Sequence, residues 1–413
     1  MNMLHELRAA NIADHVGRLT DIGPRPDGSP ANQEAVKYIV ERMQLFGLQN
    51  VELFPVTVPV VDNLETGLRV VSPIERGIRC LPNMRPGLTP PGGITRPIVF
   101  AGKGFEADFA AINCVDKIAL CFEERPWEGE SEDRPRYALD RTQNAWRAGA
   151  SAVVMSDKRD DDLITTWALA RDLDNLPSVC ISYPDFLQLR EACAAEPVQA
   201  WLRVFGDVRT GQTHIVSGIV PGETDRQIII VGSHHETNPG VPGANNSASG
   251  LSVMLELARF FAQHRSKSTI QFVATGGEES GHWANAEWLE ANLQQLKSRT
   301  KAVIVLAAIG VPNVAVYGTK WNGMTTDRSL NQVMSDSAGE LGYFLPLREN
   351  VPFLSDATEY LKHGIPATLL CSRVWDRFLK TARDTADNIS ANHLKAIADI
   401  VAYAVMQLDQ RAT

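Results

Sequence analysis

Apolar runs alternate with amphipathic segments from residue 213 to the end of the chain. Ile228–Val231 is fully apolar, and Thr269–Thr275 is a second short run of this kind. A segment with the apolar spacing of a helix follows each run, at Leu251–His264 and at residues 283–296. Further members of the series are strands at Ala302–Ile309 and Ala367–Cys371 and a closing helix at Ala391–Leu408. We therefore expect an α/β fold, with a mostly parallel sheet flanked by helices.

The N-terminal half divides into two patterns. Near the start, Ser29 and Pro30 supply a helix cap and first turn, and the apolar stripe that follows ends at Gly47. Val51–Val60 then alternates as a strand does. Residues 62–212 differ, because prolines and glycines interrupt them and only short strand-like runs remain. We predict one α/β domain from residues 1–61 and 213–413, with a smaller β-rich domain inserted at 62–212.

Composition and charge exclude several classes of function. The 413 residues include 40 lysines and arginines against 49 aspartates and glutamates, for a net charge of −9. No basic stripe is available to contact phosphates, so we exclude nucleic acid as a partner. No stretch reaches the roughly 18 apolar residues of a membrane span. The six cysteines form no CxxC pair and the first ten residues resemble no signal peptide, so we expect a cytoplasmic protein.

Polar clusters follow two of the predicted strands directly. Gly232–Glu236 comes after the first strand, and Gly276–His282 comes after the second. Because the carboxyl ends of parallel strands meet at one edge of a sheet, neighbouring strands would bring these imidazoles and carboxylates together. Such a group can bind a divalent metal and supply a carboxylate base. Alternatively, the histidines and glutamates are solvated loop residues.

Motifs spread over almost the whole chain carry a further signal. They are Leu19–Arg25, Val231–His234, Pro242–Gly250, Thr269–Glu279, Ser355-Asp356, Gly364–Ala367 and Asp384-Thr385. In this order they resemble the co-catalytic zinc aminopeptidases, the family that includes bacterial leucyl aminopeptidases, glutamate carboxypeptidase, glutaminyl cyclase and the transferrin receptor ectodomain. Residues 100–200 resemble the protease-associated insert of some members. The resemblance implies a metallopeptidase fold that hydrolyses an amide or peptide-like C–N bond in a small substrate.

The resemblance also implies roles for particular residues. His234 matches a metal ligand of the family, and Glu279 matches a second one. Glu278 matches the general base that activates water. Glu236 stands where the family has an aspartate that orients the metal-binding histidine.

Three ligands of the family pattern are missing from this chain. The bridging aspartate falls on Asn246, a second aspartate ligand falls on Ala307, and the last histidine ligand falls on Lys380. A neutral amide cannot neutralise two neighbouring cations, and an ammonium repels a metal instead of offering it a lone pair. A two-zinc site is therefore not expected here.

Two interpretations follow from this degenerate metal site. In the first, the chain is a hydrolase with one divalent metal, zinc or manganese, or with none. Glu278 and Lys380 would be catalytic, and His234 and Glu279 would hold the metal, with additional candidate ligands at His235, Glu236 and His282. Candidate substrate-binding residues are Trp283, Asp356 and Arg373. In the second interpretation, the chain is a non-catalytic pseudo-peptidase that acts as a binding or interaction protein. A homo-oligomer is compatible with both.

Overall fold

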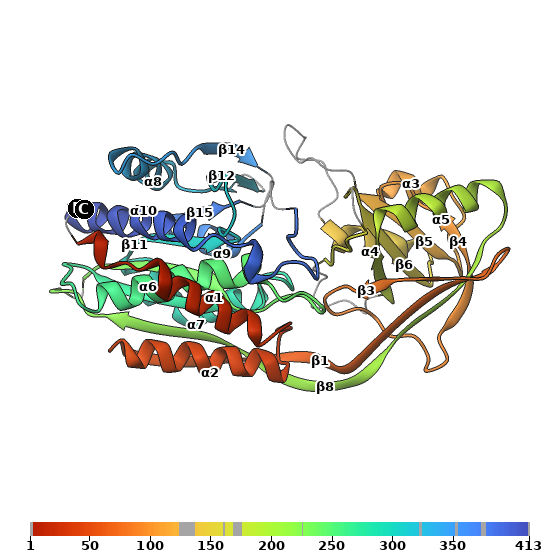
Figure 1. Cartoon of the computed structure of the whole chain (residues 1–413), viewed down its shortest axis with the longest axis horizontal. Coiled ribbons are helices and arrows are strands. Elements are labelled where there is room, and N and C mark those ends of the chain that lie inside the picture. The colour runs from red at the N-terminus through yellow and green to blue at the C-terminus, as the bar shows by residue number, and fades with distance from the viewer. Residues whose placement is uncertain are drawn as a thin grey trace.

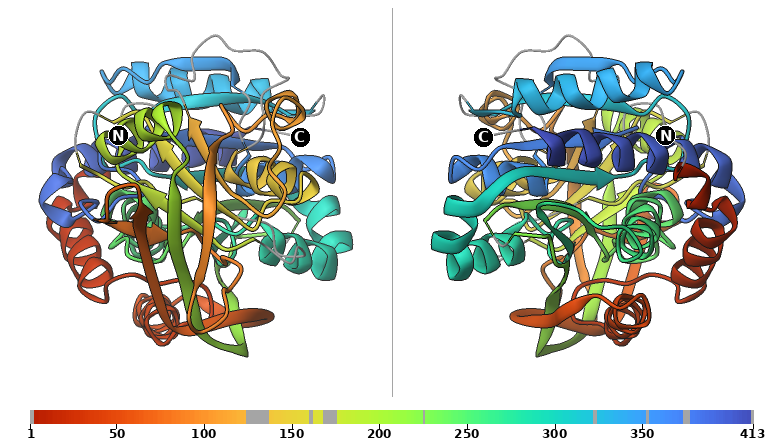
Figure 2. Two further views of the ribbon diagram at one scale, coloured as in Figure 1. Left: turned by 90° about the vertical axis from the view of Figure 1, so that its right-hand side faces the viewer. Right: turned by 90° about the vertical axis from the view of Figure 1, so that its left-hand side faces the viewer.

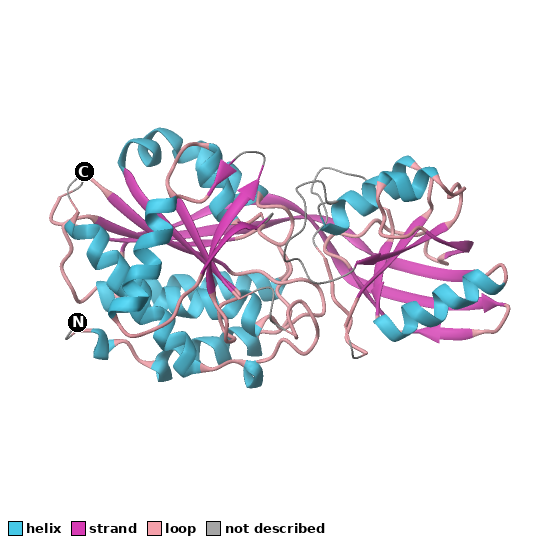
Figure 3. Cartoon of the chain, turned by 90° about the horizontal axis from the view of Figure 1, so that it is seen from above, coloured by secondary structure: helices cyan, strands magenta, loops and turns pink. Residues whose placement is uncertain are grey.

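The computed structural model divides the molecule into a large and a small lobe (Figure 1). It describes residues 3–123, 137–159, 162–167, 176–224, 226–321, 324–351, 354–372 and 377–411. Two long strands, β1 (Gln49–Ser72) and β8 (Gln199–Val220), run from one lobe into the other. Both chain termini lie at the end of the large lobe that faces away from the small lobe (Figure 3).

A mixed, mostly parallel sheet forms the centre of the large lobe. Its strands are β9 (Ile228–His234), β10 (Thr269–Thr275), β11 (Thr300–Ala307), β12 (Ala315–Trp321), β13 (Met324–Thr325), β14 (Leu347–Val351) and β15 (Ala367–Cys371). The order across the sheet is β13-β12-β15-β11-β9-β10-β8. The four central strands β15, β11, β9 and β10 are parallel, whereas β8 and β12 pair antiparallel at either side. The fold class predicted from the sequence is confirmed.

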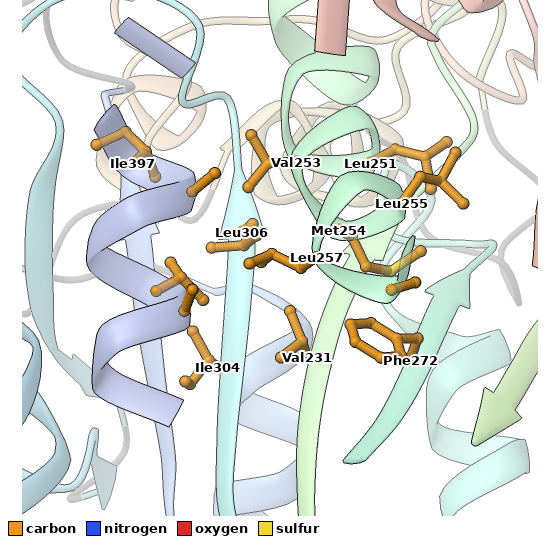
Figure 4. Close-up of a cluster of buried hydrophobic side chains, with 14 of the residues drawn as sticks. Val231, Leu251, Val253, Met254, Leu255, Leu257, Phe272, Ile304, Leu306 and Ile397 are labelled. Carbon is orange, nitrogen blue, oxygen red and sulfur yellow. The ribbon is translucent and has the colours of Figure 1, made fainter. Parts of the chain in front are cut away.

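Helices cover both faces of this sheet, as the end-on views show (Figure 2). They are α1 (Ala9–Asp21), α2 (Pro30–Leu45), α6 (Gly250–Phe261), α7 (Trp283–Arg299), α8 (Arg328–Glu340), α9 (Asp356–Lys362) and α10 (Ala391–Gln410). Alternate residues of β9 enter different cores. Ile229 and Val231 pack with α1, α2, α6, α8 and α10, whereas Ile228 and Ile230 pack with α7 and α9. Figure 4 shows part of the first core, where Val231 and Leu306 lie beside α6.

The small lobe comprises the elements between residues 76 and 195. Its strands are β2 (Arg76–Ile78), β3 (Cys80–Pro82), β4 (Ile94–Phe100), β5 (Ile118–Glu123), β6 (Ala152–Asp157) and β7 (Ser178–Ile181), and its helices are α3 (Glu106–Ala110), α4 (Tyr137–Arg147) and α5 (Tyr183–Ala195). β4 to β7 are parallel neighbours, and β4 joins them to β8. Buried apolar residues of these strands form cores separate from those of the large lobe.

β1 and β8 pair with each other along almost their whole length, from Gln49 opposite Ile219 to Ser72 opposite Gln199. The domain boundaries predicted at residues 61 and 212 lie inside these two strands. The register between them shifts between Asp62 and Glu65, close to the predicted boundary. A register shift of this kind bends and twists a strand pair.

No helix in the described part of the chain is long and apolar enough to cross a membrane. All six cysteines lie in the described part, and none of them forms a disulfide.

A buried histidine between α1 and α2 makes the stability of the fold depend on pH. Burial lowers the pKa of His15 to about 4, and its Nδ1 lies 2.6 Å from the Tyr38 hydroxyl. The ring is neutral when folded, whereas an unfolded histidine binds a proton below about pH 6.5. The contribution of the neutral His15 ring to the free energy of unfolding is therefore complete above about pH 6.5. It is lost as the pH falls toward 4, by at most roughly 3 kcal/mol.

We expect His15→Gln to flatten the loss of unfolding free energy between pH 6.5 and 4. Urea unfolding across that range measures the effect, and His5→Gln, at an exposed position, is the control. Parallel pH profiles for wild type and His15→Gln would contradict the assignment.

Candidate active site

The two polar clusters predicted from the sequence meet at one edge of the sheet. β9 and β10 are parallel neighbours, and Thr275 at the end of β10 pairs with His234 at the end of β9. The loop that follows Thr275 carries Glu278 and Glu279 and leads to α7. The chain thus places these carboxylates beside an imidazole at the carboxyl ends of parallel strands, where ligand sites of such folds lie.

His234, Glu278 and Glu279 form the one group of metal-ligating side chains found among the described residues. One ligand atom from each lies within 4.8 Å of the other two. The Nε2 atom of His234 is buried and has no hydrogen-bond partner in the described part of the chain. An unpartnered buried nitrogen is costly, so this atom is positioned to bind something that enters the site.

Both oxygens of the Glu279 carboxylate are already occupied. Asn246 Nδ2 donates to Oε1 over 2.5 Å, and the Lys380 ammonium donates to Oε2 over 2.5 Å. Burial raises the pKa of Glu279, but Lys380, His234 and Asn246 outweigh burial and lower this pKa to about 2. Glu279 is therefore an ionised carboxylate held by protein donors.

Glu278 differs from its neighbour in its surroundings. Its side chain is partly buried, and no described residue donates a hydrogen bond to its carboxylate. Burial and the adjacent Glu279 charge raise the pKa of Glu278, although His234, His282 and Lys380 oppose the shift. A carboxylate with a raised pKa accepts a proton more readily, which suits a general base.

The side chains of Asn246, Ala307 and Lys380 offer a metal few lone pairs. Ala307, at the end of β11, has no atom that could bind a metal. Two residues earlier, Val305 pairs with Gly232, which is two residues before His234, so the ends of the two strands lie side by side. Asn246 and Lys380 point N–H groups at Glu279, where a metal would need lone pairs. His234 Nε2 and the Glu278 carboxylate remain as donors for a single cation, fewer than the three protein ligands usual for a catalytic zinc.

The Asp384 carboxylate and the Arg25 guanidinium hold the backbone around Asn246. The segment Ala244–Ser249 is a short helical turn that Asn246 interrupts with φ −117° and ψ 87°. Asp384 accepts hydrogen bonds from the backbone N–H groups of Asn245 and Asn246, over 2.6 and 3.1 Å. Arg25 is fully buried and donates to the backbone carbonyls of Leu19, Gly23, His235 and Pro242. These contacts fix the loop that presents Asn246.

Lys380 has a left-handed backbone conformation, with φ +59°, that is unfavourable for a residue other than glycine. Residues of the small lobe contact the backbone of Lys380 and of the residues that precede it. Arg159 donates to the carbonyls of Arg377 and Leu379, the latter over 2.9 Å. The Thr166 N–H donates to the Lys380 carbonyl over 3.1 Å.

His235, a candidate additional ligand, lies outside the group of three and forms hydrogen bonds with both ring nitrogens. Its Nδ1 lies 3.1 Å from Asn32 Nδ2, and its Nε2 lies 2.8 Å from the His214 carbonyl oxygen. Nε2 therefore carries the proton and Nδ1 accepts from the amide, so neither nitrogen has a lone pair to offer. Burial lowers the pKa of His235 to about 4, in keeping with a neutral structural histidine.

Glu236 and His282 lie outside the group of three. The Oε1 atom of Glu236 accepts the backbone N–H of Glu279 over 2.9 Å, which ties the two strand-end loops together. Burial, with nearby acidic groups, raises the pKa of Glu236 well above its usual value. His282 Nδ1 lies 3.6 Å from Asp356 Oδ1, an ion-pair distance longer than a hydrogen bond.

The candidate substrate-binding residues have separate surroundings. Asp356 is buried and accepts hydrogen bonds from Thr275 Oγ1 and Asn285 Nδ2, so its side chain joins β10 to α7. Trp283 donates its Nε1–H to Ser280 Oγ over 2.8 Å. Arg373 lies outside the described residues.

Sequence reasoning missed the residues that support the site from a distance. Asp27 accepts hydrogen bonds from Gly277 N–H and Ser280 Oγ, and so holds the loop of Glu278 and Glu279. Arg85 of the small lobe lies 3.6 Å from Asp27 and stacks 4.6 Å from the Trp283 ring. Asp27 lies two residues after the Leu19–Arg25 motif, so its position in the sequence could have indicated a role near the site. No sequence motif near Arg85 or Arg159 indicates their contacts.

Comparisons with known proteins agree with this arrangement. Residues 215–405 match the model of "Peptidase family M28". The chain is 26% identical to aminopeptidase YwaD of Bacillus subtilis (strain 168) over 97% of its own length and 85% of the relative. The solved aminopeptidase of Aneurinibacillus sp. strain AM-1 superposes with a TM-score of 0.74 and 25% identity, over 99% of this chain and 96% of that one. BSAP, a zinc aminopeptidase of Bacillus subtilis, shares the fold with a TM-score of 0.76 and 24% identity, over 98% and 97% of the chains. Residues 215–405 are therefore similar to the peptidases of family M28, and the chain is a hydrolase of the metallopeptidase class with the fold of the zinc aminopeptidases.

Proposed function

We propose that this aminopeptidase-like hydrolase cleaves an amide or peptide-like C–N bond of a small substrate with at most one divalent cation. Lys380 would supply a fixed positive charge in place of a second cation. One observation carries the proposal: the Lys380 ammonium lies 2.5 Å from Glu279 Oε2 inside the group that would bind metal. Asn246 donates a hydrogen bond to Oε1, the other oxygen of the Glu279 carboxylate.

Each residue then has a chemical task that needs no second cation. Glu278 takes a proton from the attacking water, as its raised pKa favours, and gives it to the leaving amine nitrogen as the C–N bond breaks. Lys380 offers positive charge to the oxygen on which negative charge develops. A cation held at His234 Nε2 would polarise the same carbonyl when bound. The small lobe, which resembles a protease-associated insert, borders the site through Arg85 and Thr166.

The purified protein should contain no more than one divalent metal ion per chain. Elemental analysis after purification with added zinc, and again with added manganese, measures the ratio. Asn246, Ala307 and Lys380 leave too few lone pairs for a second ion. Two tightly held zinc ions, about 3.5–4 Å apart as in two-metal hydrolases, would contradict the proposal.

Glu278→Gln should lower turnover of aminoacyl-p-nitroanilide or dipeptide substrates by roughly two or more orders of magnitude, the scale of a lost general base. The substitution keeps size and shape, so the unfolding transition should move little. Glu290→Gln, at an exposed position of α7, is the matched control. Unchanged turnover in Glu278→Gln would remove this residue from the mechanism.

A second candidate function is binding without catalysis. The observation that favours it is that Glu279, with both oxygens satisfied by Asn246 and Lys380, is stable without any metal. If wild-type protein hydrolyses no peptide or amide across panels with added Zn²⁺, Mn²⁺ and Co²⁺, this second candidate is preferred. A cytoplasmic location remains part of our proposal, and six cysteines without a disulfide support a reducing compartment.

A further inference from the structure

Lys380 occupies the junction between segments that belong to different lobes. On its C-terminal side, Asp384 binds the backbone of Asn245 and Asn246 in the large lobe. On its N-terminal side, the carbonyls of Arg377 and Leu379 accept from Arg159 in the small lobe. The position of Lys380 relative to Glu279 therefore depends on both lobes.

Arg159 is itself held rigidly. Its side chain is 6% exposed, and its Nε donates to Asp157 Oδ2 over 3.2 Å at the end of β6. Asp157 Oδ1 in turn accepts the Thr165 hydroxyl over 2.9 Å. A guanidinium fixed by a buried carboxylate presents its remaining N–H groups in a set direction. That direction is toward the backbone that precedes Lys380.

The main chain at Thr166 makes a second link between the lobes. Its N–H donates to the Lys380 carbonyl over 3.1 Å, and its carbonyl accepts from Asn238 Nδ2 over 3.2 Å. Asn238 lies on the loop that follows His234 and Glu236. One residue of the small lobe thus bridges the Lys380 segment and the loop after the His234 strand.

The backbone of Lys380 needs such support. A residue other than glycine stays in the left-handed region only where its surroundings determine the conformation. The contacts at the carbonyls of Arg377, Leu379 and Lys380 all come from Arg159 and Thr166.

We propose that the small lobe positions the Lys380 ammonium, because Arg159 and the Thr166 backbone hold Lys380 beside Glu279. Arg159 is a positioning residue, because it touches neither Glu278 nor Glu279. The role bears on hydrolysis only through the proposed function, in which Lys380 supplies charge. The placement of Lys380 is measurable without any substrate.

Amine acetylation read by peptide mass spectrometry tests the placement in the full chain. In wild type, Lys380 should react much more slowly than Lys37, whose side chain is 77% exposed, because the Lys380 side chain is 11% exposed and paired. In Arg159→Met, acetylation of Lys380 should rise roughly tenfold or more, the scale of losing a hydrogen bond from a charged donor. Arg159→Lys, which keeps a charge opposite Asp157, should restore part of the protection.

Arg76→Met is the matched control. Arg76 pairs with Asp185 inside the small lobe and contacts no residue of the large lobe among the described contacts. Acetylation of Lys380 in this variant should stay at the wild-type rate. An unchanged rate in Arg159→Met, or an equal rise in Arg76→Met, would overturn the proposal.

A wild-type measurement covers the case in which Arg159→Met does not fold. Residue-resolved deuterium exchange should find the Thr166 amide protected, since its acceptor is the Lys380 carbonyl. Exchange at the rate of an open loop would overturn the proposal. Absence of hydrolysis in wild type, with this protection and acetylation pattern intact, would remove the proposed function and leave the positioning role standing.

Discussion

Lys380→Ala is expected to destabilise the fold by about 3–5 kcal/mol, the cost of removing one partner from a buried ion pair. The Lys380 ammonium lies 2.5 Å from Glu279 Oε2, and Glu278 and Glu236 lie close by. Without it, ionised Glu279 is left under-compensated in a buried position, and its pKa rises. The free energy of unfolding from urea titration at pH 7 measures the loss.

The pH dependence of that variant provides an independent check. In wild type, the pKa of Glu279 is lowered to about 2, so its stabilising contribution is complete above the unfolded value near 4.5 and is lost as the pH falls toward 2. Lys380→Ala should abolish this contribution, so the variant and wild type should converge in stability at low pH. Lys37→Ala, which removes an exposed lysine, should cost well under about 1 kcal/mol. A cost for Lys380→Ala as small as this control would contradict the buried pair.

Restoring three family ligands together should convert the site into one that binds two zinc ions. The variant combines Asn246→Asp, Ala307→Asp and Lys380→His, which supply a bridging carboxylate, a second carboxylate and an imidazole. Elemental analysis should rise to two zinc ions per chain. Zinc should also raise the melting temperature, because binding to the folded state alone stabilises by about 4 kcal/mol at a thousandfold excess over Kd.

Single substitutions provide the control for this gain. Lys380→His alone should not produce a two-zinc site, because Asn246 still cannot bridge the ions. If the triple variant folds and binds no more zinc than wild type, Asn246, Ala307 and Lys380 are not the positions that determine metal number.

The predicted elements of the large lobe are accurate where the hydrophobic pattern is strong. The strands expected at Thr269–Thr275 and Ala367–Cys371 have those bounds in the structure, and β9 begins at the expected Ile228. Buried parallel strands are continuous apolar runs, so their limits are readable from composition. α8 was not predicted, although Leu330, Val333 and Met334 have helical spacing.

β1 is longer than the predicted Val51–Val60 for a physical reason. The register shift between Asp62 and Glu65 interrupts the alternation of apolar and polar positions, and the strand then continues to Ser72. Since the side-chain period is two, a single inserted residue moves later residues to the opposite face. A pattern search therefore ends the strand where the structure only bends it.

The candidate site was predictable in its chemistry and not in its contacts. Motif positions placed His234, Glu278, Glu279 and Lys380 in one region, and the structure brings these four side chains together. The hydrogen bonds of His235 were not readable from the sequence, because its partners Asn32 and the His214 carbonyl come from distant segments. The contacts of Arg159 depend likewise on how the lobes meet.

The pairing of β1 with β8 imposes an order on folding during synthesis. Gln49 cannot meet Ile219 until the intervening small lobe has left the ribosome, roughly ten seconds or more later at about 5–20 residues per second. Until then, Ile12 and Leu19 of α1 and Ile39 of α2 lack the core in which they are fully buried in the finished protein. The nascent chain thus carries an unsatisfied apolar surface at its leading end while its middle folds first, and that interval is when it most needs protection from aggregation.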